Sequence, residues 1–155
     1  MSETHNVFVS HRHEDDKLVG DLKKMLAGRG VDIRDSSVTS DNPNNANNTE
    51  YIKSILRDRI EWAGKVIVII SPDTRNQEWV DWEIEYANKF DNKQIIGVWA
   101  PGTEPGDMPE PLRDYAHAIV NWDADAIIGA INGEENWTDP DGHDAPTTRP
   151  PSVKC

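Results

Sequence analysis

One glutamate, Glu83, has the surroundings expected of a catalytic carboxylate. It follows Trp79 by four positions, about one helical turn, so the two side chains share a flank of the expected helix. Val80 and Ile84 face inward beside it, which gives the carboxylate apolar neighbours. A carboxylate that is partly removed from water has a raised pKa, as catalytic carboxylates do. A helix-surface glutamate in an ordinary salt bridge gives the same pattern, so the residues alone leave both alternatives open.

The segment before this helix is expected to be a buried strand. Residues 66–70 read VIVII, a continuous β-branched run that is typical of a strand covered on both faces, and Ser71-Pro72-Asp73 ends it. Ligands of open α/β sheets bind at the carboxyl ends of the strands. The helix that carries Glu83 is therefore expected to start at a ligand-binding edge.

Strand and helix signals alternate along the rest of the chain. Strands are expected at residues 6–10, 31–34, 66–70, 94–99 and 117–121, and helices at 14–29, from Thr49 to before Gly64, from near Gln77, at 112–116 and at 123–131. Five β/α units with right-handed crossovers predict an α/β fold, a flavodoxin-like doubly wound sheet of five parallel strands in three α/β/α layers. This architecture carries many functions, so the fold alone does not define one.

Length and cysteine content predict one intracellular domain. The 155 residues fit a single domain at 1–132, followed by a polar, proline-rich tail at 133–155 that we expect to be mobile or loosely attached. Cys155 is the only cysteine, which suits a reducing compartment. No leader or long apolar run is visible, so we expect a cytoplasmic protein without a membrane partner. The net charge of -12 argues against nucleic-acid binding but allows a small anionic ligand such as a dinucleotide.

Several chemistries common on this fold lack their motifs. The turn after the first strand reads SHRHEDD and has no glycine that would let the backbone approach a phosphate. Ser71 stands where a receiver domain would have its aspartate, and it has no glycine elbow for a hydrolase triad, so a capping role is expected for it. Arg12 could hold a phosphate bidentately or pair with a local acid.

We expect no metal site. Two groups combine histidine with acidic residues, but the first lacks a third separated ligand and the second lacks the spacing and terminal glutamate of a calcium loop. These groups are His11, His13, Glu14 and Asp15, and Asp139, Asp141, His143 and Asp144. Three tryptophans, Trp79, Trp82 and Trp99, fall near the presumed ligand edge, where a ring could stack on a base, although core packing explains them equally well.

The chain resembles the TIR (Toll/interleukin-1 receptor) domain family over residues 6–131. Residues 7–16, VFVSHRHEDD, resemble the opening box of the family, and the polar loop at 36–48 occupies the place of its BB loop. Trp79-Val-Asp-Trp-Glu83-Ile matches the Trp-x-x-x-Glu-hydrophobic pattern of NAD-consuming TIR domains. The resemblance is greatest to the ThsB-type TIR-like proteins of bacterial Thoeris anti-phage systems. Gln77, His11 and the tip of the polar loop depart from the usual family residues.

This resemblance implies an enzyme of the NAD glycohydrolase or ADP-ribosyl cyclase type, with NAD as a substrate and no cofactor. It makes Glu83 the catalytic residue and suggests that further residues line the NAD site, namely Phe8, Ser10, His11, Arg12, Ser71, Trp79 and Trp82. The implied partners are other copies of the chain on activation, a phage-derived trigger and an effector that senses an ADP-ribose-derived messenger. Two alternatives stay open, a non-enzymatic TIR adaptor that acts by self-association and a nucleoside 2-deoxyribosyltransferase-like enzyme.

Overall fold

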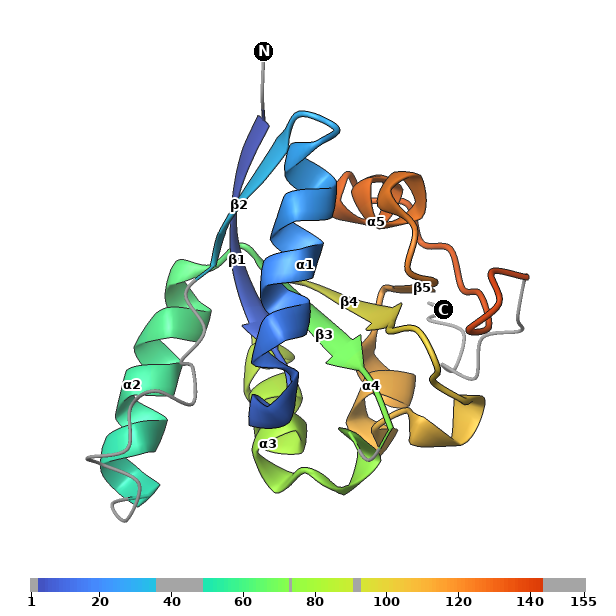
Figure 1. The fold of residues 1–155 in the computed structure, drawn as a ribbon. Helices are drawn as coiled ribbons and strands as arrows, with labels where there is room; N and C mark the ends of the chain where they lie inside the picture. Colours follow the sequence, from blue (N-terminus) through green and yellow to red (C-terminus); the bar gives the residue numbers. More distant parts are fainter. Residues whose placement is uncertain (1–2, 36–48, 73, 91–92, 144–155) are drawn as a thin grey trace, which may run out of the picture.

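The computed structural model describes residues 3–35, 49–72, 74–90 and 93–143, so the polar loop at 36–48 and the end of the tail lie outside the described residues. The described chain forms one five-stranded sheet in the order β2-β1-β3-β4-β5 (Figure 1). All neighbouring strands are parallel. The strands are β1 (Glu3–Ser10), β2 (Val31–Asp35), β3 (Lys65–Ile70), β4 (Gln94–Trp99) and β5 (Ala118–Val120). The predicted flavodoxin-like fold is therefore confirmed.

Helices follow the strands as the sequence predicts. They are α1 (Asp16–Ala27), α2 (Thr49–Trp62), α3 (Glu78–Ala87), α4 (Glu110–Tyr115) and α5 (Ala124–Ile131), with short 3-10 turns η1 (His13–Asp15), η3 (Thr74–Asn76) and η4 (Pro105–Asp107). The expected cap of the last helix is confirmed, because the Asp123 carboxylate accepts the Ala126 N–H at 3.0 Å. Among the described helices, none combines the length and the apolar character that crossing a bilayer requires.

The sheet separates two apolar layers. Helices α1 and α5 cover one face, and α2, α3 and α4 cover the other, which gives the predicted three-layer arrangement (Figure 1). Successive strand residues point to opposite faces, so Val7 and Val9 lie in the α1/α5 layer, while Phe8 lies in the layer of α2, α3 and α4. The same alternation turns Ser10 toward α3. The alternation of side chains along β1 therefore places Ser10 on the face of the sheet where the candidate site lies.

The first part of the C-terminal tail lies against the edge of the sheet. Residue 137 forms a parallel bridge with Ile119, whose N–H donates to Asn136 O at 2.9 Å and whose carbonyl accepts the Thr138 N–H at 2.7 Å. Trp99 Nε1 also donates to Thr138 O at 2.8 Å. The Trp137 ring packs against the core layer and adds apolar area to this contact. The expected division into a domain at 1–132 and a mobile or loosely attached tail stays a prediction.

Glycine at one strand position relieves close packing by a helix. A Cβ atom on Gly97 of β4 would lie 2.9 Å from Leu112 Cδ2 of α4 and 3.2 Å from Ile119 Cγ1. Both of these side chains are fully buried, so they have little room to move. The absence of a side chain at Gly97 therefore lets α4 approach the sheet.

We expect Gly97→Ala to lower the free energy of unfolding by about 1–3 kcal/mol, the usual cost of overpacking a dense core. Urea denaturation measures this change. Gly20→Ala in α1 is the matched control, because a Cβ atom there meets nothing within 4 Å. It should stabilise the chain by about 0.5–1 kcal/mol, since alanine is the better helix residue. Equal stability of Gly97→Ala and the parent chain would contradict the packing argument.

Candidate active site

The candidate site is built around the carboxylate of Glu83. In α3 the side chains of Val80, Glu83 and Ile84 are buried on the face toward the sheet, and Glu83 is only 8% exposed. The Ser10 hydroxyl at the end of β1 donates a hydrogen bond to Glu83 Oε1 at 2.5 Å. The expectation of a carboxylate among apolar neighbours thus agrees with the structure, while its catalytic role stays a prediction.

Burial changes the protonation of this carboxyl group. Removal from water raises the pKa of Glu83 from 4.5 to about 8, although the hydrogen bond from Ser10 acts in the opposite direction and lowers it. The desolvation effect is the larger of the two. At neutral pH the isolated chain therefore holds a proton on Glu83 for most of the time.

The site lies where the winding of the sheet changes direction. β1 pairs with β2 on one side and with β3 on the other, and Ser10 is in register with Val68 of β3. The helix after β1, α1, covers one face of the sheet, and the helix after β3, α3, covers the opposite face (Figure 1). The connections that follow β1 and β3 therefore turn to opposite faces of the sheet at the carboxyl ends of these two strands. Such a switch point is where ligands of doubly wound sheets bind.

A hydrogen-bonded network, here called the Asp15 brace, ties these two strand ends together. Arg12 donates two bonds to the Asp15 carboxylate, from Nε at 3.0 Å and from Nη2 at 3.3 Å. The Ser71 hydroxyl donates to the same carboxylate at 2.5 Å and lies 2.9 Å from Thr74 Oγ1. Of the two alternatives left open for Arg12, the structure shows the pairing with a local acid. Ser71 serves as a link between loops.

Two more of the expected ligand residues are buried and face inward. His11 Nδ1 donates to the Val9 carbonyl at 2.8 Å, and its Nε2 lies 2.7 Å from Asp16 Oδ1. Phe8 is buried in the core layer below α2 and α3. Both side chains therefore pack against or bond to the chain itself near the end of β1. The His13 side chain lies outside the described residues.

The aromatic residues of α3 border a cavity at the surface. Its volume is about 380 Å³, and Lys53 of α2 lines it together with Glu78, Trp79 and Trp82 of α3. Trp79 is 40% exposed there, and its ring meets Trp82 edge to face at 6.2 Å. Glu83 does not line this cavity, so the cavity and the carboxylate are neighbouring features of one helix. Trp99, in contrast, is a core residue bonded to Thr138.

Sequence reasoning did not single out Lys53 or Glu78, and it considered Asp15 only as a member of a possible metal-binding group. Lys53 and Arg57 are spaced four positions apart on α2, and both cations lie over the Trp82 ring, at 5.7 and 5.9 Å from its centroid. Their spacing on one helix flank was a signal that could have been found. The partnership of Asp15 with Ser71 had no such signal, because the two residues are 56 positions apart.

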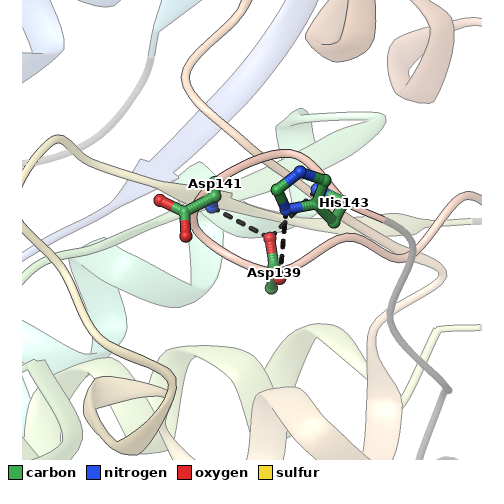
Figure 2. A group of neighbouring side chains, drawn as sticks. All are labelled: Asp139, Asp141 and His143. Carbon is green, nitrogen blue, oxygen red and sulfur yellow. Dashed lines mark hydrogen bonds and ion pairs between the residues drawn. The ribbon is translucent and has the colours of Figure 1, made fainter.

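A turn in the tail brings three possible metal ligands together. The ligand atoms of Asp139, Asp141 and His143 lie within 4.8 Å of one another (Figure 2). Asp139 Oδ1 accepts the backbone N–H groups of both other residues at 3.0 Å, the arrangement of an Asx turn. These bonds account for the grouping as local turn structure, and the expected absence of a metal site stays a prediction.

Comparison with curated proteins finds a distant relative. A curated protein of Cytobacillus dafuensis named "Putative cyclic ADP-D-ribose synthase TIR2" is 24% identical over 119 residues, which cover 76% of this chain. The match spans only 31% of that relative's length, about a third.

Two solved structures share the fold. The TIR domain of the Toll-related receptor TRR-2 of Hydra magnipapillata has a TM-score of 0.54 at 21% identity, and the match covers 83% of this chain and 93% of that one. A 2-deoxyribosyltransferase of Bacillus psychrosaccharolyticus has a TM-score of 0.52 at 16% identity, with 74% and 84% covered.

The family model described as "Thoeris protein ThsB, TIR-like domain" matches residues 8–105. That range runs from the core of β1 to the first residue of η4, so it contains both partners of the Ser10–Glu83 bond and the whole of α3. It accounts for more than half of the 155 residues. The chain therefore belongs to the family of the Thoeris protein ThsB, TIR-like domain.

Proposed function

We propose that this chain cleaves the bond between nicotinamide and ribose in NAD and that Glu83 is its catalytic residue. The product is an ADP-ribose-derived signalling molecule in anti-phage defence, made after copies of the chain assemble in response to a phage-derived trigger and sensed by a separate effector. The observation that carries this proposal is the buried carboxylate of Glu83, held by Ser10 at the switch point of the sheet. The name of the Cytobacillus dafuensis relative, a cyclic ADP-D-ribose synthase, supports the same reaction class.

The chemistry needs a negative charge beside the reacting ribose. Nicotinamide leaves as a neutral molecule and takes the electron pair of the C–N bond, so positive charge develops on the ribose ring. A carboxylate that is already fixed in a site with little water stabilises this charge more strongly than water does. Attack by water then gives ADP-ribose and a proton, and attack by an internal adenine or hydroxyl group gives a cyclic product and a proton.

The raised pKa of Glu83 connects this chemistry to pH. With a pKa of about 8, the carboxyl group is mostly neutral in the isolated chain near pH 7, whereas the proposed role requires the ionised form. The nicotinamide ring of NAD carries a positive charge. Its approach favours the carboxylate and lowers the pKa of Glu83, so binding of NAD releases a proton. The substrate thereby creates the charge that the reaction uses.

Glu83→Gln should reduce nicotinamide release from NAD by about a hundredfold or more, because the amide cannot stabilise the developing charge. The measurement is mass spectrometry of the products after incubation under crowded conditions that promote assembly. The mass of the second product distinguishes linear from cyclic or conjugated ADP-ribose.

Glu85→Gln is the matched control, since Glu85 lies on the same helix with an exposed side chain. It should release nicotinamide at the parental rate. If Glu83→Gln also keeps the parental rate, another group performs the reaction. NAD that survives in every condition, with the chain still self-associating, would favour the adaptor alternative. Cleavage of deoxynucleosides in place of NAD would favour the deoxyribosyltransferase alternative.

The pH profile of cleavage should report the ionisation of Glu83. We expect kcat/KM to rise with pH and to level off above the Glu83 pKa of about 8. The Ser10→Ala variant loses the hydrogen bond that lowers this pKa, so its profile should shift to higher pH. Initial rates across a pH series measure both midpoints, and a Ser10→Ala midpoint at or below the parental one would refute this role of Ser10.

The free energy of unfolding should also depend on the ionisation of Glu83, in the absence of any substrate. Between pH 4.5 and about 8 the folded chain keeps a proton on Glu83 that the unfolded chain has lost. The free energy of unfolding therefore falls as pH rises through this window, by an amount on the order of a few kcal/mol, and levels off above it. Glu83→Gln should lack this decline. Urea denaturation of both chains at pH 5, 7 and 9 tests it, and parallel curves would contradict a raised pKa.

A further inference from the structure

The outer edge of β2 is suited to pair with a second copy of the chain. β2 stands first in the strand order of the described sheet, with β1 as its neighbour on one side (Figure 1). Its other side presents backbone N–H and C=O groups with which, among the described residues, no strand pairs. We propose that this edge binds β2 of a second copy in an antiparallel pair centred on Ile33. The two sheets then form one continuous sheet about a two-fold axis.

The exposed charges of β2 complement themselves in this arrangement. Asp32 and Arg34 are both exposed and lie two positions apart, so they point to the same face of the sheet. Neither of them forms an ion pair with another residue that the structure describes. In the pair centred on Ile33, Asp32 lies directly opposite the partner's Arg34, with Cβ atoms about 5 Å apart. The two-fold axis repeats this contact, so two ion pairs form.

The neighbouring antiparallel alignments of the two strands are unfavourable. Sliding one strand by one residue brings Asp32 opposite the partner's Ile33, so the apolar face of one copy would continue into the charged face of the other. Sliding by two residues places either Asp32 opposite the partner's Asp32 or Arg34 opposite the partner's Arg34. Like charges that face each other directly are destabilising. The charge pattern of β2 therefore selects the alignment centred on Ile33.

Apolar groups lie on both faces of the proposed contact. Ile33 belongs to the layer of α1 and α5, so the Ile33 side chains of the two copies meet on that face. On the other face, the Trp62 ring at the end of α2 is 42% exposed, and the Arg34 guanidinium lies over it, 5.5 Å from the ring centroid. This contact restricts the Arg34 side chain before pairing, which reduces the entropy that the ion pair has to offset.

Sedimentation velocity of the full chain measures the pairing. The contact involves one short strand from each copy, β2, so the dimer should be weak and its fraction should rise between micromolar and millimolar concentrations. Added salt should lower this fraction, because exposed ion pairs are screened. Arg34→Glu or Asp32→Lys alone puts like charges opposite each other twice and should weaken association by about tenfold or more. An equimolar mixture of these two variants should associate again, because each charge then faces an opposite one.

Lys89→Glu and Glu85→Lys on α3 are the matched controls. They make the same changes of charge at exposed positions, and Lys89, like Arg34, lies over an aromatic ring, that of Tyr86 at 5.6 Å. Both should associate as the parent chain does.

Three results would overturn the proposal: a parent chain that stays monomeric throughout, a dimer that both β2 variants retain, or a mixture of the variants that does not associate. The pairing does not depend on the proposed reaction. NAD cleavage by a strictly monomeric chain would reject this inference alone, whereas a dimer that obeys the charge pattern but leaves NAD intact under crowded conditions would reject the proposed function alone.

Discussion

The hydrogen bond between Ser10 and Glu83 is the constraint on which the site depends. It joins the end of the first strand to the third helix across 73 positions of sequence, inside the apolar layer between sheet and helices. A carboxyl group there loses most of its hydration, and one hydroxyl group replaces only part of it. The surrounding core has to offset this cost. The continuous apolar packing of β3 and β4 on both faces supplies the stability that lets α3 keep a costly group buried.

The Asp15 brace links the loops that follow the paired ends of β1 and β3. Arg12 and Ser71 come from the loops after β1 and β3, and both donate to the carboxylate of Asp15. His11 adds a contact to the first residue of α1. These charge-assisted bonds fix the backbone that carries Ser10, and so they fix the position of the hydroxyl that faces Glu83. These polar residues thus hold the geometry of the edge, and their expected contacts with NAD stay predictions.

Local patterns in the sequence predicted most of the architecture. The β-branched run of β3, the bounds of β4 and the Asp123 cap all depend on residues within a few positions of one another, whereas the burial of Glu83 also depends on its contact with Ser10 across the fold. The brace depends on which side chains meet across the fold, and spacing in one chain does not encode this. The contact of residues 136–138 with β5 likewise has no local signal, since Trp137 is a single aromatic residue in a polar, proline-rich segment.

The bridge between Ile119 and residue 137 has a consequence for how copies of the chain can associate. A parallel sheet has two edge strands, and each presents backbone N–H and C=O groups that another chain can pair with. At β5 this position is occupied by the chain's own backbone at residues 136 and 138. Within the described ranges, the β2 edge carries no such docked segment. Direct pairing of another chain with Ile119 of β5 therefore requires residues 136–138 to leave this position.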